Sequence, residues 1–411
     1  MPNPRGAWTP STIIIDESIA EHATTHEICS RCAGATTYLS RLSSTESDED
    51  LLRRVVCAVP MDQGALSRLA RSTLLLYSSG DICHQMAAGS VASRRCFNFL
   101  KLTPYAGVCR AECSYCWFKD PVLIPKINVT FFDHLPVLLR RFSRETNLPM
   151  VFTFTHYKTD CFSIEHLTGF VHRLVEVFER ETQFHVQFLT KLDNVDALLL
   201  RPPTRGSIVC FSVNAVSVAR DIELGTSSVE QRLQAAGNLA KCGVPVLLRI
   251  DPLLAFGGWE EQYRELVGLI LQHVTPLHIT LGTPRYQDDD ELARMVSTTR
   301  SNKAAQIMKK QAALMGHHKP GSPERPGPTG FQYYFKNMPI SYPRGLRAAL
   351  YRNVIEHCWK LDPSIPIGLC EEPVDVWDDC GLSWCGDSTR DCSCGFVPQN
   401  ARSSEDESIR K

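Results

Sequence analysis

The sequence predicts an α/β protein: a partial (β/α)6 TIM-like barrel of parallel strands, with a small N-terminal lead-in and a C-terminal cysteine-rich extension. Three observations predict this fold. Short apolar runs alternate with amphipathic segments through the middle of the 411 residues, and this alternation is typical of parallel strands joined by crossover helices. The length allows a large core. A triplet of cysteines follows the first expected strand, at the strand end where such barrels carry their chemistry.

The expected strands are short apolar runs, and the expected helices lie between them. With one strand placed before Cys109, the other strands fall at 150–155, 184–190, 207–213, 244–250 and 277–281, with a last strand-like piece at 365–369. Helices are expected at 164–181, 194–200, 228–241, 259–273 and 344–359. Apolar residues recur at helical spacing in the first of these helices. Ser227 or Ser228 can cap the third helix, and Gly243 ends it.

The chain divides into five expected segments. They are a helical N-terminal lead-in at 1–95, the barrel core at 96–286, a polar Pro/Gly-rich connection at 287–330, the C-terminal part of the core at 331–378, and a cysteine-rich tail at 379–411. No apolar run reaches the roughly 20 residues that span a bilayer, and the N-terminus lacks the pattern of a secretory signal. We therefore expect a cytoplasmic protein without membrane contact.

The composition is that of an ordinary globular protein, with 43% hydrophobic residues, 22% charged residues and a net charge of −1. No run of basic residues suggests a nucleic-acid groove, and phosphate contacts normally require clustered lysine and arginine. A nucleic-acid partner is therefore not expected. Seventeen cysteines in a chain of this length favour metal binding over a disulfide framework. Their odd number and clustering fit a reducing compartment.

Cys109, Cys113 and Cys116 form a C-x3-C-x2-C motif. Three thiolates this close can bind three corners of a cubane iron–sulfur cluster, whereas a structural zinc site requires four ligands, usually in two separated pairs. The stretch resembles the cluster loop of radical S-adenosylmethionine (SAM) enzymes, and Tyr115 is part of that resemblance. It implies a [4Fe–4S] cluster whose open iron binds SAM, followed by cleavage to methionine and a 5′-deoxyadenosyl radical. The alternative is three unrelated cysteines on a loop.

Two further groups of cysteines are candidate metal sites. Cys380, Cys385, Cys392 and Cys394 lie within fifteen residues of one another in the tail. They can bind a second iron–sulfur cluster or a structural zinc, or remain free thiols. The C-x2-C motif at 29–32, with His22 and His26 upstream, is either a zinc site or a turn with two reduced thiols.

The segment from 157 to 286 resembles the spore photoproduct lyase family. The matching motifs are TD at 159–160, IEHLTG at 164–169, LTK at 189–191, FSVN at 211–214, ELGTSS at 223–228, RLQAA at 232–236, GGWEEQY at 257–263, LGTPRY at 281–286 and, further on, LCEEPVDVW at 369–377. Together they extend the resemblance over roughly residues 95–377.

The resemblance implies roles for individual residues. Cys109, Cys113 and Cys116 would bind the cluster. Tyr115 would contact the adenosyl end of SAM, while Lys191 and Ser212, with Asn214 of the same motif, would bind its carboxylate and ribose region. A lysine suits a carboxylate as a point charge. The alternatives are a surface lysine and a serine bonded to the backbone in the core.

The chain departs from the family at two positions. Lesion-repairing members carry a cysteine that returns a hydrogen atom to the product radical, and Tyr157 occupies its position here. Cys161, four residues later, is a candidate substitute. Trp117 stands where the repair enzymes carry a tyrosine of the radical relay. Tyr157, Cys161, Tyr115 and Trp117 are thus the candidate catalytic residues.

These departures and the tail cysteines favour a radical SAM enzyme that abstracts hydrogen from a small molecule. A nucleoside-like natural product is the expected substrate, as in antibiotic biosynthesis, with sulfur insertion or electron transfer through a second cluster. The family implies flavodoxin or ferredoxin as electron donor. The alternative is a DNA repair lyase that splits spore photoproduct thymine dimers. A third reading is a non-catalytic zinc-binding scaffold.

Overall fold

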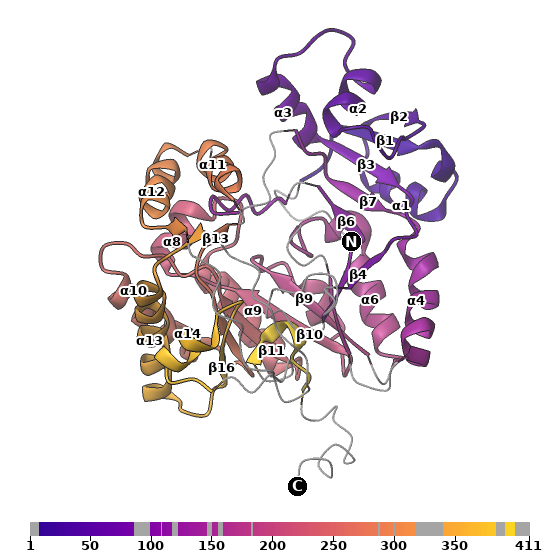
Figure 1. Ribbon diagram of the computed structural model, residues 1–411. Coiled ribbons are helices and arrows are strands. Elements are labelled where there is room, and N and C mark those ends of the chain that lie inside the picture. Colours follow the sequence, from indigo (N-terminus) through magenta and orange to yellow (C-terminus); the bar gives the residue numbers. More distant parts are fainter. Residues whose placement is uncertain are drawn as a thin grey trace.

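The computed structural model describes residues 8–85, 99–107, 109–116, 122–145, 150–154, 159–181, 184–286, 288–299, 301–317, 340–383 and 391–398. Its largest element is a curled eight-stranded sheet in the order β16-β12-β11-β10-β9-β8-β5-β4 (Figure 1). The strands are β4 (Cys83–Gln85), β5 (Phe99–Leu102), β8 (Met150–Phe154), β9 (Phe184–Thr190), β10 (Ser207–Ser212), β11 (Val246–Ile250), β12 (Ile279–Leu281) and β16 (Ile367–Leu369). All neighbours run parallel except β4 and β5, which confirms the predicted partial barrel.

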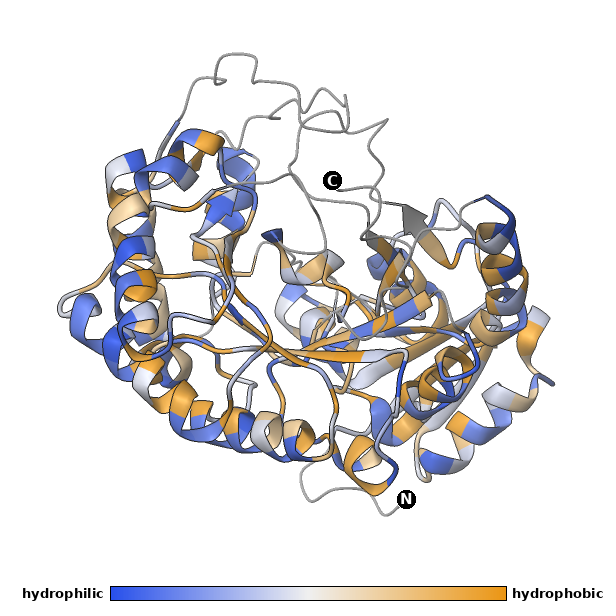
Figure 2. Cartoon of the chain, turned by 90° about the horizontal axis from the view of Figure 1, so that it is seen from below, coloured by the Kyte–Doolittle hydropathy of each residue, from blue (hydrophilic) through white to orange (hydrophobic). Residues whose placement is uncertain are grey.

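Helices cover the outer face of this sheet and form an arc around it (Figure 2). They are α4 (Phe131–Glu145), α5 (Glu165–Thr168), α6 (Phe170–Phe178), α7 (Asp196–Leu200), α8 (Val216–Ile222), α9 (Val229–Lys241), α10 (Trp259–His273), α13 (Arg344–Leu361) and α14 (Val374–Asp379). Ser228 caps α9 in a capping box with Gln231, as its serine predicts. The helix expected at 164–181 is divided into α5 and α6 because Gly169 adopts a left-handed conformation, with φ of 65°.

The two faces of the sheet differ because side chains alternate along each strand. On β10, Val209 and Phe211 point into the main core beneath the helices. Ile208 and Cys210 point the other way and form a separate buried cluster with Leu247. The tail segment 391–398, with the short helix η2 (Ser393–Gly395), packs against this inner face. This segment of the tail therefore lies inside the barrel.

The N-terminal part contains a second, five-stranded sheet. Its order is β2-β1-β3-β7-β6, with β1 (Thr12–Asp16), β2 (Thr36–Ser40), β3 (Thr73–Tyr77), β6 (Tyr105–Ala106) and β7 (Lys126–Asn128). The helices are η1 (Glu17–Ile19), α1 (Ala23–Arg31), α2 (Asp48–Val55) and α3 (Gln63–Ser72). The expectation of a purely helical lead-in at 1–95 is corrected here, because periodicity does not separate a five-residue buried strand from a helix segment. The limits of the five segments stay a prediction.

The expected polar connection at 287–330 also contains regular structure. It includes α11 (Asp289–Ser297) and α12 (Asn302–Ala313). A three-stranded sheet of β13 (Arg285–Tyr286), β15 (Ile340–Ser341) and β14 (Gly316–His317) follows. The Pro/Gly-rich run that suggested the connection lies outside the described residues. Among the described helices, none combines the length and apolar character needed to cross a bilayer.

Candidate functional site

The cysteine motif lies on a loop that packs against the segment after α8. The Ser114 N–H donates to the Ile222 carbonyl at 2.8 Å, and the Gly225 N–H donates to the Ala111 carbonyl at 3.0 Å. A Cβ atom at Gly225 would lie 2.3 Å from the Arg110 carbonyl oxygen, so the approach requires glycine. Hydrogen bonds to the end of α8 and to the segment after it therefore fix the loop that carries Cys109, Cys113 and Cys116.

Two of the three motif thiols are protonated at neutral pH in the metal-free chain. Burial raises the pKa of Cys109 to about 12, and nearby Asp160 and Cys116 raise it further. Burial, with Glu223 close by, also raises the pKa of Cys113 to about 12, against the opposing charge of Lys191. A metal cluster must therefore displace protons when it binds these sulfurs.

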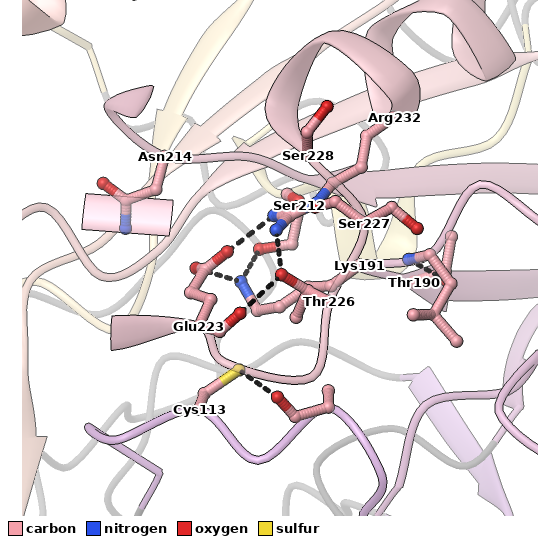
Figure 3. A network of polar contacts seen from close by, with 12 residues as sticks. Cys113, Thr190, Lys191, Ser212, Asn214, Glu223, Thr226, Ser227, Ser228 and Arg232 are labelled. Carbon is pink, nitrogen blue, oxygen red and sulfur yellow. Dashed lines mark hydrogen bonds and ion pairs between the residues drawn. The ribbon is translucent and has the colours of Figure 1, made fainter. Parts of the chain in front are cut away.

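Lys191 and Ser212 meet at the carboxyl ends of β9 and β10, as predicted (Figure 3). The Lys191 Nζ donates to the Ser212 Oγ at 2.5 Å and to the Glu223 Oε1 at 3.1 Å. It also lies 5.5 Å from the centre of the Tyr115 ring, and the Tyr115 hydroxyl donates to Glu223. Three of the predicted SAM-binding residues therefore gather beside the cysteine loop.

Glu223 is the centre of this polar network, although sequence analysis gave it no role. Its Oε2 pairs with the Arg232 Nη1 at 2.6 Å, and both side chains are fully buried. Burial by itself would raise the pKa of Glu223, but Lys191 and Arg232 bring it down to about 2. The group is thus a carboxylate held between two cations. Both residues lie inside the family-like motifs at 223–228 and 232–236, which was the available signal.

Asp160 links the cysteine loop to Lys191. Its N–H donates to the Cys109 sulfur at 3.3 Å. Its carboxylate accepts hydrogen bonds from the Thr190 hydroxyl at 2.9 Å and from the Lys191 N–H at 2.6 Å. A further bond comes from the Phe162 N–H at 3.0 Å. Through these bonds, Asp160 fixes the positions of Cys109 and Lys191 relative to each other.

The other predicted site residues lie apart from this network or outside the described chain. Asn214 is fully buried, and its amide donates to the Pro252 carbonyl at 2.8 Å and accepts from the Tyr263 hydroxyl at 3.1 Å. Cys161 is fully buried, and its sulfur donates to the Leu189 carbonyl at 3.2 Å within the outer core. Trp117, Tyr157 and Cys385 lie outside the described residues, so their roles stay predictions.

The three tail cysteines that the structure describes are not all brought to one place. The Cys380 sulfur lies after α14 and contacts the Ala348 carbonyl at 3.9 Å. Cys392 and Cys394 lie inside the barrel with Cys370. The pKa of Cys392 is raised by a hydrogen bond with Cys394, by burial and by the nearby Cys370. Sequence analysis did not single out Cys370.

Metal-ion sites of the zinc type are not formed by the candidates that the structure describes. Over the described ranges, no three histidine, cysteine or acidic side chains are arranged to bind a metal ion. His22, expected beside Cys29 and Cys32, has both ring nitrogens engaged, with Asp133 at 3.0 Å and the Thr24 N–H at 3.1 Å. The iron–sulfur and zinc assignments of the tail stay predictions.

Comparison with known proteins identifies relatives of one kind. Residues 100–283 match the family model described as spore photoproduct lyase. The spore photoproduct lyase of Bacillus subtilis (strain 168) is 31% identical over 173 residues, which are 40% of this chain and 48% of that protein. The spore photoproduct lyase of Geobacillus sp. (strain Y412MC61) is 30% identical over 166 residues, again 40% and 48%. The matched region spans about half the length of these curated relatives.

Solved structures of spore photoproduct lyase share the fold. The lyase complexed with dinucleoside spore photoproduct superposes with a TM-score of 0.67 at 17% identity, covering 88% of this chain and 98% of that one. A doubly substituted form with bound AdoMet and dinucleoside spore photoproduct gives a TM-score of 0.65 at 17% identity, with the same coverage. These findings confirm the resemblance that the sequence motifs indicated.

The same findings correct the main functional prediction. A small-molecule substrate was expected and a nucleic-acid partner was not, yet the relatives are lyases of a photoproduct that is bound as a dinucleoside. Nothing supports a role in antibiotic biosynthesis. The expectation was wrong because a net charge of −1 averages over the whole chain and does not report a local binding surface. Departures from the family at two single positions also do not outweigh the many matching motifs.

Proposed function

We propose that this chain, a spore photoproduct lyase-like protein of the radical SAM superfamily, splits spore photoproduct in DNA with a [4Fe–4S] cluster and SAM. The proposal is supported by the names of the relatives and by the AdoMet and dinucleoside photoproduct in a structure of the same fold. Within the chain, one observation carries it: Lys191, Ser212 and Tyr115 meet beside the cysteine loop at the carboxyl ends of parallel strands.

Cys109, Cys113 and Cys116 are the proposed ligands for three corners of the cluster. They share one loop, which Gly225 allows to lie close to the segment after α8. The N–H that Asp160 directs at the Cys109 sulfur is the kind of hydrogen bond that stabilises a cluster thiolate. The carboxylate of Asp160 is engaged by three donors, so it is not available as a fourth ligand.

When bound, the cluster and SAM would supply a 5′-deoxyadenosyl radical. The protein's part is to bind and orient. Lys191 presents an ammonium group to the SAM carboxylate, and Glu223 with Ser212 fixes its position. Tyr115 is held by Glu223 on the same side. Because this network is largely buried, it excludes water from the reacting groups.

The test is anaerobic turnover of the reconstituted protein with SAM, dithionite and dinucleoside spore photoproduct. We expect 5′-deoxyadenosine and the repaired dinucleotide, both lost in Cys113→Ala. Lys191→Met should weaken SAM binding by roughly tenfold or more, the loss of one charge-assisted contact, measured by calorimetry. Lys303→Met, which removes an exposed lysine, is the matched control. Formation of 5′-deoxyadenosine with an untouched photoproduct would contradict the proposed substrate.

The setting of the reaction is supported by the cysteines. The fifteen cysteines in the described parts of the chain are all free of disulfide bonds. This supports the reducing, cytoplasmic compartment that the composition predicts.

A further inference from the structure

A cluster of thiols and arginines lies inside the barrel and has no part in the site described above. It consists of Cys370, Cys392, Cys394, Arg249 and Arg285. We propose that Cys370 is the thiol that donates a hydrogen atom to the carbon radical left on the substrate when the photoproduct is split. The inference rests on the proposed lyase function. It supplies a hydrogen donor for a chain in which Tyr157 stands at the position of the family's donor cysteine.

Cys370 stands at the rim where the substrate is expected. It directly follows β16, and its N–H extends the strand pairing by donating to the Leu281 carbonyl at 2.7 Å. It is therefore at the same carboxyl edge as Lys191 and Ser212. Cys394 lies deeper, because its neighbour Ser393 bonds to Thr280 and Gln187 in the middle of β12 and β9. Of the thiols in the cluster, Cys370 is the one placed at the rim.

The sulfur of Cys370 is fixed by two guanidinium groups. The Arg249 Nη2 and the Arg285 Nη2 each donate to it at 3.0 Å. The other nitrogen of Arg249, Nη1, donates to the Cys394 sulfur at 2.9 Å. Asp251 pairs with Arg249 at 2.8 Å and with Arg285 at 3.3 Å, and so fixes both cations. Such a frame orients a thiol without occupying its reactive hydrogen.

The same two cations argue against a metal at this position. They hold positive charge within 3.0 Å of the Cys370 sulfur, where a metal ion would have to bind against their repulsion. On this ground we treat Cys370 as a thiol.

The thiol cluster adjoins the polar network of Lys191, Ser212, Glu223 and Tyr115. We call this group the SAM network, with Arg232 as a further member. Arg249 on β11 lies opposite Ser212 on β10 in the strand register, so their backbones are separated by about one strand spacing, roughly 4.8 Å. Residues opposite each other point to the same face of a sheet, and Ser212 is bonded to Lys191. A substrate beside the SAM network thus has Cys370 across from it, on the other side of Arg249.

The hydrogen transfer balances as follows. The S–H bond of Cys370 breaks, a C–H bond forms on the substrate carbon, and a thiyl radical remains on the sulfur. One electron from the external one-electron reductant and one proton from water restore the thiol. The Cys370 side chain is screened from solvent, with 1% exposed. This limits side reactions of the substrate radical and of the thiyl radical that follows it.

The first experiment follows hydrogen into the product. Turnover is run in D2O, where thiols carry deuterium, with wild type, Cys370→Ser and the control Cys358→Ser, which removes a buried thiol on α13. For Cys370→Ser we expect at least about a tenfold fall in repaired, deuterated dinucleotide while 5′-deoxyadenosine still forms. The Cys358→Ser protein should behave like wild type. Unchanged repair and deuteration in Cys370→Ser would overturn the proposal.

The second experiment needs no turnover. Thymidylyl-(3′→5′)-thymidine is added to the full-length protein without SAM or reductant, and ultraviolet light links thymine to a neighbouring thiol. Mass spectrometry should find the adduct on Cys370. An adduct only on other residues would overturn the proposal. If no protein forms 5′-deoxyadenosine in the first experiment, the lyase function fails, and the position of this adduct still decides whether Cys370 contacts the dinucleotide.

Discussion

Glu223 is the residue on which the order of the SAM network depends, because it is the only partner shared by Lys191, Arg232 and Tyr115 among the contacts that the structure describes. Glu223→Gln leaves Arg232 fully buried without a charge partner. We expect the free energy of unfolding to fall by about 3–5 kcal/mol, measured by urea denaturation. Glu261→Gln, which breaks an exposed pair with Arg264, should cost less than about 1 kcal/mol. Equal losses in both variants would contradict this role.

At the residue scale, the structure brings together predicted residues whose motifs are distinctive, while their roles stay predictions. Lys191, Ser212 and Tyr115 were predicted together and lie together. Glu223 and Arg232 were missed because a charged residue in an amphipathic segment is usually exposed, and only the fold shows that both are buried. Cys370 was missed because the cysteines around it are distant in sequence.

At the scale of elements, Glu165 at the junction of α5 and α6 should make the stability of the folded protein depend on pH. The Glu165 carboxylate accepts from the Val171 N–H at 2.9 Å at the start of α6, and burial raises its pKa to about 7. The folded state therefore holds a proton that the unfolded state releases near pH 4.5. The contribution of Glu165 to stability is present below pH 4.5 and decreases as the pH rises to 7, by up to roughly 3 kcal/mol.

The measurement is the free energy of unfolding of wild type and Glu165→Gln from pH 4.5 to 8. The difference between the two proteins isolates this group from other titrations. We expect the variant to lose less stability across that range than wild type. Parallel curves would show that Glu165 does not titrate with a raised pKa.

The packing of the cysteine loop gives a second prediction at this scale. Gly225→Ala places a methyl group 2.3 Å from the Arg110 carbonyl, so the loop must move away from the segment after α8. We expect fewer irons bound per chain after anaerobic reconstitution. Gly268→Ala on α10 is the matched control, since a Cβ atom there meets nothing within 4 Å. Iron content equal in both variants would contradict the expected shift.

Element boundaries were predicted best where a strand or cap has a strong local signal. Residues 184–190 and 259–273 match β9 and α10. The N-terminal strands were not recognised because β1 and β3 are short apolar runs that fit either state. Helix α4 was also not predicted.

At the scale of the whole molecule, the tail completes the inner face of the barrel. Deleting residues 391–411 uncovers the buried cluster of Ile208, Cys210 and Leu247, and we expect a lower melting temperature by calorimetry because apolar surface is exposed. Deleting only 399–411 keeps the packed segment and is the control. If both deletions melt like the full chain, the tail does not stabilise the barrel.

The fold class could be predicted from the alternation of strands and helices, but the packing of the tail could not. Spacing between Cys380 and Cys394 suggested one site, whereas the fold sends Cys380 to α14 and Cys394 into the barrel. Sequence distance limits how far two residues can separate, and it does not decide which side of a sheet each one reaches.

The burial of the Lys191–Glu223–Arg232 network has a consequence for ionic strength. Glu223 and Arg232 are fully enclosed, and 15% of the Lys191 side chain is exposed, so dissolved counter-ions do not reach the charges. Phosphate contacts of a lesion-bearing strand would instead lie in solvent and weaken steeply as salt is added. Raising the salt concentration should therefore release the proposed DNA substrate while leaving the affinity for SAM nearly unchanged.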